Sequence, residues 1–181
     1  MGMELFELLA ARRSVRQYTE EPVSRKALEK IVAAGLMAPS SKNLHSTELL
    51  VVEDRTVLKA MAHCKPRFGQ MLEQAPAAIV VMGRVESHAW VEDASVAMMA
   101  MMLRAAELGL GSCWVQVRHM TAEEKGADGQ CLTSHQYLAR LLDLPEGVEV
   151  EAILALGHEV KKQRPRTLEE ARPERVHWGR V

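Results

Sequence analysis

One segment near the centre of the chain constrains the fold more than any other. Residues 94–103 are apolar at every position except Ser95, and they lie within a helix that we expect from His88 to Leu108. A helix that is apolar around its whole circumference must be covered on all sides, because a surface helix keeps one polar face. Charged residues flank the segment, and it is too short to cross a bilayer. We therefore expect a helix buried in the middle of a globular domain.

Length and composition exclude several classes of protein. The chain has 181 residues, which fits one domain over residues 1–181, and its 48% apolar content is ordinary for a globular protein. Its 23 Lys and Arg residues balance 24 Asp and Glu residues, so the bulk charge does not favour nucleic acid as a partner. The sequence also predicts no membrane segment and no secretory signal, since Glu4 and Glu7 interrupt the apolar face of the N-terminus.

Cysteine and histidine usage indicates a reduced protein without a metal site. The 3 cysteines are an odd number without a CxxC pair, which is typical of a cytoplasmic protein. The histidines are scattered, and none has the spacing of zinc ligands.

Hydrophobic periodicity and capping residues predict the other elements. Ser24 can cap a helix that Pro39 stops, and residues 40–47 form a polar loop. Residues 119–135 are polar and contain glycine, so we expect a loop or a poorly ordered cap there. The last residues, from Gly157 onward, are polar and interrupted by proline, and we expect them to extend over the surface of a partner subunit. The remaining predicted elements are helices at 3–13, 55–63, 67–74 and 136–142 and strands at 49–52, 77–82, 112–117 and 150–156.

Two basic clusters lie at opposite ends of the chain. Residues 12–16 bring three arginines and a serine together, and residues 161–166 hold a second group of lysines and arginines. The planar guanidinium group suits phosphate oxygens, and the serine hydroxyl adds a neutral donor. Local cations in a nearly neutral protein favour one small phosphorylated ligand, although exposed salt bridges are the alternative reading of these arginines.

Four short motifs, in order along nearly the whole chain, resemble those of the nitroreductase family of FMN-dependent oxidoreductases. The motifs are Arg12-Arg13-Ser14-Val15-Arg16, Ala38-Pro39-Ser40-Ser41-Lys42-Asn43, Glu92-Asp93-Ala94-Ser95 leading to Gly109-Leu110-Gly111-Ser112-Cys113-Trp114, and Leu144-Pro145-Glu146-Gly147 with Leu156-Gly157-His158.

This resemblance implies a fold and an activity. The fold is an α+β sandwich with a mostly antiparallel sheet, helices on both sides and an intertwined homodimer in which the tail, residues 157–181, crosses to the partner. FMN then lies in two sites at the dimer interface. NADH or NADPH reduces the flavin, and a nitroaromatic, a quinone or a related small molecule accepts the electrons in a ping-pong cycle. No residue stands out as an obligatory catalytic acid or base.

The resemblance also implies which residues contact the cofactor. The N-terminal cluster holds the phosphate and ribityl chain, the tail closes over the phosphate, and a loop after the second helix reaches the partner's flavin. A strand runs along the isoalloxazine ring, and one glutamine contacts the ring edge; core packing is an equal alternative for Trp114. The N-terminal cluster is Arg12, Arg13, Ser14 and Arg16, and the tail residues are Arg164 and Arg166. The loop residues are Pro39, Ser40, Ser41 and Asn43. The strand residues are Trp114, Val115 and Gln116, and the glutamine is Gln70.

The chain departs from the family pattern at two places. His45 stands where the family often has glutamine, so this histidine could contact the flavin or the substrate, or lie in solvent. The tail reads Gly157-His158-Glu159 and lacks the usual proline, which leaves the register of Arg164 and Arg166 open. Other functions therefore remain open: a flavin-binding or flavin-sequestering protein, a specialised flavin chemistry within the family, or a domain that binds another phosphate.

Overall fold

An antiparallel sheet of four strands forms the centre of the molecule in the computed structural model, which describes residues 4–180. The strand order is β1-β2-β6-β3, and each neighbouring pair is antiparallel. The strands are β1 (Thr47–Val52), β2 (Ala77–Arg84), β3 (Gly111–Gln116) and β6 (Val148–Gly157). This arrangement confirms the predicted α+β class with a mostly antiparallel sheet.

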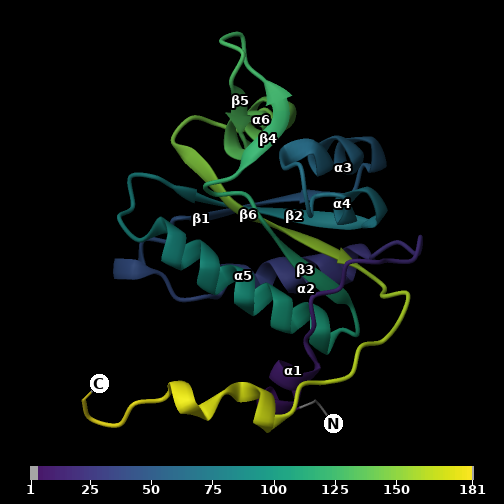
Figure 1. The fold of residues 1–181 in the computed structure, drawn as a ribbon, viewed down its shortest axis with the longest axis vertical. Helices are drawn as coiled ribbons and strands as arrows, with labels where there is room; N and C mark the ends of the chain where they lie inside the picture. The colour runs from purple at the N-terminus through teal and green to yellow at the C-terminus, as the bar shows by residue number, and fades with distance from the viewer. Residues whose placement is uncertain (1–3, 181) are drawn as a thin grey trace.

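Helices cover both faces of the sheet (Figure 1). On one face lie α2 (Arg25–Leu36) and the long α5 (Trp90–Glu107), and on the other lie α3 (Arg55–Met61), α4 (Met71–Gln74) and α6 (Ser134–Leu142). The sequence explains this layering, because residues 77–82 form one continuous apolar run and are buried on both faces.

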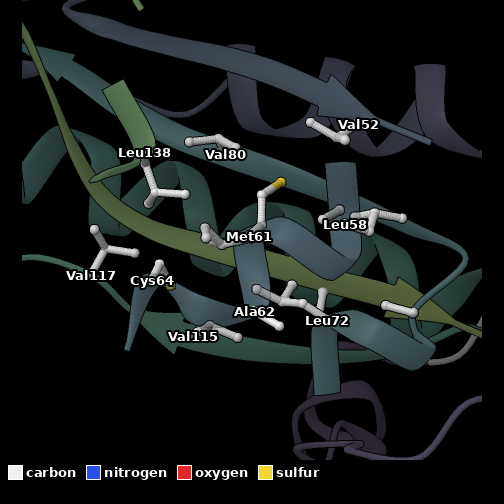
Figure 2. Close-up of a cluster of buried hydrophobic side chains, with 14 of the residues drawn as sticks. Val52, Leu58, Met61, Ala62, Cys64, Leu72, Val80, Val115, Val117 and Leu138 are labelled. Atoms are coloured by element: carbon white, nitrogen blue, oxygen red, sulfur yellow. The ribbon is translucent and has the colours of Figure 1, made fainter. Parts of the chain in front are cut away.

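The core is therefore divided into two layers by the sheet. In the layer under α3, α4 and α6, Leu58, Met61 and Leu138 gather over strand residues such as Val80 and Val115 (Figure 2). The other layer packs α2 and α5 against the opposite face. Its fully buried side chains include Ile31, Ile79, Met98, Met101 and Leu154. This second layer fixes α5 against the sheet, and α5 in turn positions the segments at its two ends.

The N-terminal helix and the C-terminal tail lie together beyond α5. Helix α1 (Leu5–Ala11) contacts α5, and the tail runs beside it before leaving the body of the molecule (Figure 1). Residues 160–180 are all exposed, and Trp178 exposes 89% of its surface. The tail contains two single 3₁₀ turns, η3 (Leu168–Ala171) and η4 (Pro173–Arg175). Up to Arg166, backbone hydrogen bonds hold the tail against the N-terminal segment of the same protomer.

The prediction of a loop at 119–135 is wrong. The segment forms a hairpin of β4 (Thr121–Lys125) and β5 (Cys131–Thr133), and Thr133 caps α6. A turn that includes Gly129, at φ +78°, closes the hairpin. The two strands lack the alternating apolar pattern of a half-buried strand, because Ala122 is their only buried residue. Contacts with residues distant in sequence, such as the ion pair of Arg140 with Glu124, hold the hairpin in place.

The prediction that α5 is covered on every side is also wrong for the single protomer. Val96 and Met99 expose 44% and 37% of their surface, whereas Met98 and Met101 are fully buried. One apolar strip of α5 therefore faces outward. An apolar sequence pattern predicts that a helix surface avoids water, but it does not predict whether the same chain covers that surface.

Element boundaries differ in smaller ways. Residues 67–70 are not helical, since Phe68 adopts φ +65°, so only α4 remains of the expected helix at 67–74. Two short 3₁₀ turns, η1 (Ser41–Asn43) and η2 (Ala62–Cys64), lie at the predicted loop and at the end of α3. The predicted cap of α2 is confirmed, because the Ser24 hydroxyl accepts from the Ala27 N–H at 3.2 Å. No helix in residues 4–180 has the length and apolar character that a bilayer crossing requires.

Candidate functional site

The two basic clusters lie side by side within one protomer. The tail runs alongside residues 10–19, and the Arg166 N–H donates to the Ala10 carbonyl at 2.9 Å. The Arg13 guanidinium donates to the Arg164 carbonyl at 3.3 Å, and the Gln163 amide donates to the Ser14 carbonyl at 3.2 Å. These bonds hold the register of the tail, and Gln163 is a residue that the sequence did not single out.

The N-terminal cluster is fastened to the edge of the sheet. The Val15 N–H donates to the Ser112 carbonyl at 2.9 Å, and Ser14 forms a parallel bridge with Ser112. Gly111 permits this close approach, because a Cβ atom there would lie 2.8 Å from Cγ2 of Val15. The glycine in the Gly109-Leu110-Gly111 motif therefore brings the arginines against the start of β3.

The joined clusters form an anion-binding surface. Burial lowers the pKa of Arg12, and the positive charges of Arg166 and Arg13 lower it further. A cavity of about 520 Å³ is lined by Arg13, Ser14, Arg16, Lys161, Lys162 and Arg164, among others. Cations held this close repel one another, and a bound dianion would relieve that repulsion.

Arg164 differs from the other arginines of this surface. Its guanidinium is paired with Glu170 at 2.9 Å, and its carbonyl accepts from Arg13. The Glu170 carboxyl belongs to the tail itself, and its pKa is lowered by the Thr167 N–H and then by Arg164. In the protomer, Arg164 therefore positions the tail, while the charge of Arg166 lowers the pKa of Arg12 more than that of Arg13 does.

Beyond Ser112, the outer edge of β3 has no neighbouring strand among residues 4–180, and it continues from the anion-binding surface. In an antiparallel pair, the backbone groups of successive residues alternate between facing the partner strand and facing away from it. The Ser112 carbonyl faces away from β6 and the Val117 N–H faces β6. The backbone groups of Trp114 and Gln116 therefore face away from β6, as those of Ser112 do. Val115 points into the core, where it is buried. The edge from Ser112 to Gln116 is about 13 Å long. It offers alternating donors and acceptors, which a flat heterocycle can bind.

The side chains of Trp114 and Gln116 are linked beneath this edge. The Trp114 indole donates to the Gln116 side-chain oxygen at 2.8 Å, and the Gln116 amide nitrogen donates to the Arg118 carbonyl at 3.2 Å. Trp114 also packs against the core layer of α2 and α5. Both readings of Trp114 are therefore compatible, because its side chain packs while its backbone faces outward.

The loop of Pro39, Ser40, Ser41 and Asn43 lies at the other end of α5. The buried Asp93 carboxylate accepts from the Ser41 N–H and from the Ser46 hydroxyl, both at 2.8 Å. The Ser40 hydroxyl accepts from the His45 N–H at 2.9 Å. Asp93 therefore clamps the loop to the first turns of α5, a role that the sequence motif alone did not reveal.

Three side chains of this loop are held outward. Lys42, Asn43 and His45 have φ values of 50°, 55° and 48°, a region that residues other than glycine seldom adopt, and all three are exposed. Such strain persists only where neighbouring contacts enforce it, as the Asp93 clamp does here. The loop thus presents these three polar side chains to the outside of the protomer.

The two halves of the predicted site do not meet within one protomer. The arginines lie near Ala106 and Gly109 at the C-terminal end of α5, and the loop is bound to Asp93 near its N-terminal end. Asp93 and Ala106 both lie on α5, and their separation along the helix axis is about 20 Å. The loop and the arginines therefore lie toward opposite ends of α5 in the protomer.

Gln70 lies apart from both halves. It is exposed at the start of α4, and its amide donates to the Pro66 carbonyl at 3.3 Å. In the protomer it contacts neither the arginines nor the edge of β3.

The chain matches one family model, curated relatives and solved structures over most of its length. The model of the nitroreductase family matches residues 9–65 and 63–158. A protein of Archaeoglobus fulgidus named NADH dehydrogenase/NAD(P)H nitroreductase is 34% identical over 160 residues, which are 86% of this chain and 85% of that protein. The structure of an FMN-dependent nitroreductase from Clostridium difficile R20291 superposes with a TM-score of 0.91 at 34% identity, covering 98% of this chain and 100% of that one. A Desulfovibrio desulfuricans nitroreductase solved in complex with FMN has a TM-score of 0.72 at 26% identity, covering 94% and 96% of the two chains.

Proposed function

Because the chain belongs to the nitroreductase family, we propose that it is an FMN-dependent oxidoreductase that passes reducing equivalents from NADH or NADPH to a nitroaromatic, a quinone or a related acceptor. The observation that carries the proposal is the joined arginine surface, which continues into the outward edge of β3. A ligand with a phosphate at one end and a flat heterocycle at the other matches this pair of features.

The residues present fit FMN. The phosphate requires at least two cations and neutral donors, which Arg12, Arg13, Arg16, Arg166 and Ser14 supply. The ring requires a flat edge with donors and acceptors, which the backbone of Trp114 and Gln116 supplies. When bound, FMN provides the hydride chemistry, while the protein provides binding, orientation and electrostatics.

The proposal includes a homodimer in which each site is shared. The loop with Ser40, Ser41 and Asn43 would reach the flavin of the partner, which resolves its distance from the arginines of its own protomer. The outward strip of α5, with Val96 and Met99, and the exposed tail, with Trp178, supply apolar surface for such an interface. Gln70 and His45 belong to the proposed ring site only through this assembly.

The chain's residues would act on the cofactor through charge and orientation. Backbone N–H groups aimed at the ring stabilise the negative charge that the ring gains when it is reduced. The arginines would hold the phosphate end and so limit the orientations open to the ring, as a ping-pong cycle with two successive substrates requires.

Spectroscopy and light scattering test the proposal. The purified protein should be yellow, should carry up to one FMN per chain, and should lose its flavin absorbance when NADH or NADPH is added without oxygen. An acceptor such as a quinone should then restore the absorbance. A yellow protein that neither nicotinamide bleaches would be a flavin-binding protein without turnover, and a monomer that holds FMN tightly would refute the shared site.

A further inference from the structure

A buried carboxylate lies directly behind the proposed ring site. Glu151 of β6 exposes 5% of its surface, and its Oε2 atom accepts no hydrogen bond within residues 4–180. A buried carboxylate without full hydrogen bonding is costly, so the fold must retain it for a reason other than packing.

A β-bulge places Glu151 there. Val81 pairs with Ala152 and Met82 pairs with Val150, so Glu151 is the extra residue and has no partner in β2. Its carbonyl accepts from both the Val117 and the Arg118 N–H groups, at 3.3 and 3.0 Å. Bulges re-aim side chains and occur beside active sites. This one fixes the end of β3 and turns a carboxylate toward the linked side chains of Gln116 and Trp114.

The surroundings of Glu151 make proton binding favourable. Burial raises the pKa of Glu151, and the negative charge of Glu92 on α5 raises it further. A hydrogen bond from the Gln116 side chain and the charges of Arg118 and His119 lower this pKa in part. The Arg118 Nε atom lies 3.9 Å from Oε2, which is a loose ion pair, and its guanidinium lies 5.8 Å above the Trp90 ring. A single loose pair does not compensate the buried charge fully.

Solvent protons can reach this group. A cavity of about 650 Å³ opens at the end of β3 and is lined by Trp90, Arg118 and Val150. Of these, Arg118 lies 3.9 Å from the Glu151 carboxylate and Val150 precedes Glu151 in β6. Arg118 itself is one-third exposed. The carboxylate is therefore shielded from bulk water but one side chain away from a wet cavity.

We infer that Glu151 is the proton-holding group of the flavin site: it is ionised beside the oxidised flavin and binds one solvent proton at Oε2 when the flavin is reduced. A hydride from the nicotinamide carries two electrons and one proton, so the ring site gains one negative charge. The proton that Glu151 takes up offsets this charge, and it is released when an acceptor removes the hydride. This inference rests on the proposed function, and it adds a buried titrating group to the proposed site.

Potentiometric titration of the FMN-loaded protein between pH 6 and 9 tests the inference. Each additional proton bound in a two-electron reduction makes the slope of midpoint potential against pH steeper by about 30 mV per pH unit. We expect the wild-type slope to exceed that of Glu151→Gln by this amount, with the variant at the higher potential at alkaline pH. Glu149→Gln, an exposed neighbour on the same strand, is the matched control and should follow the wild type.

The outcomes separate the two proposals. Equal slopes in wild type and Glu151→Gln, with normal reduction by NADH or NADPH, would overturn the role of Glu151 and leave the proposed function standing. A protein that binds no FMN would overturn both. If only the variant fails to load FMN, the reduced-minus-oxidised infrared spectrum of the wild type with ¹³C-labelled glutamate decides. An isotope-sensitive protonated-carboxyl band that appears on reduction supports the inference, and its absence refutes it.

Discussion

Removal of the Asp93 carboxylate should release the loop that carries Ser40, Ser41 and Asn43. The carboxylate accepts two hydrogen bonds of 2.8 Å, from the Ser41 N–H and the Ser46 hydroxyl, and Asp93 is only 5% exposed. Both donors lie on the loop and the acceptor lies on α5. Asp93→Ala therefore breaks every side-chain bond that Asp93 makes between the loop and α5.

The size of the effect follows from those two bonds. A hydrogen bond to a charged group is worth about 1.5–3 kcal/mol, and two bonds that share one acceptor are not additive. We expect Asp93→Ala to lower the free energy of unfolding by about 3 kcal/mol, a large part of the roughly 5–15 kcal/mol typical of a domain. Asp93→Asn keeps one acceptor oxygen and should lose about half as much.

Urea unfolding of the protein without FMN measures this loss directly. The control is Glu92→Ala, the exposed neighbour on α5. FMN affinity, from quenching of flavin fluorescence, should fall further in Asp93→Ala than stability alone explains, because the loop belongs to the proposed shared site. The reasoning would be refuted if Asp93→Ala unfolded within about 0.5 kcal/mol of the parent, the size of an ordinary surface substitution.

Four further predictions follow from the site. Arg166→Ala should raise the FMN dissociation constant at least about tenfold, because it removes a charge-assisted contact, whereas Arg55→Ala on the opposite face should not; equal affinities would misplace the phosphate. Deletion of residues 160–181 should abolish both FMN binding and the dimer in light scattering, and a truncated dimer with full FMN content would show that the tail is dispensable. His45→Ala should lower the flavin midpoint potential and His45→Gln should restore it, whereas identical potentials would leave the side chain in solvent. In apoprotein melting curves, Glu151→Gln should gain stability over the parent as pH rises, because burial raises the Glu151 pKa in the folded state and the stability of the protonated form is lost as pH passes that value; parallel curves would contradict it.

Local signals predicted the elements well where the pattern was local. The cap at Ser24, the apolar strand at 77–82 and the long helix that begins near Trp90 follow from neighbouring residues, so the sequence located them within a few positions. The hairpin after β3 was missed because its polar strands are held by residues distant in sequence, such as Arg140. Short polar strands carry little periodic signal of their own.

The residues of the site were largely recognisable, but their grouping was not. Motif resemblance named the arginines, the serine loop and the strand with Trp114 and Gln116. It did not reveal that Asp93 fastens the loop or that Gln163 fixes the tail, because both act through hydrogen bonds across the fold. Glu151 gave no signal, since a glutamate in an apolar strand looks like an irregularity until the bulge shows where it points.

The sequence by itself determined most of the helices and the four strands of the main sheet, but not the hairpin of β4 and β5. It also determined which residues carry charge suited to a phosphate, because these properties depend on side chains a few positions apart. The tertiary structure decided where they meet. It brought Arg12 and Arg166 together along the tail, separated them from the loop by the length of α5, and left Val96 and Met99 uncovered in the protomer. These outcomes depend on packing between residues far apart in the chain. Bringing such residues together costs conformational entropy, and only the contacts of the complete fold offset that cost.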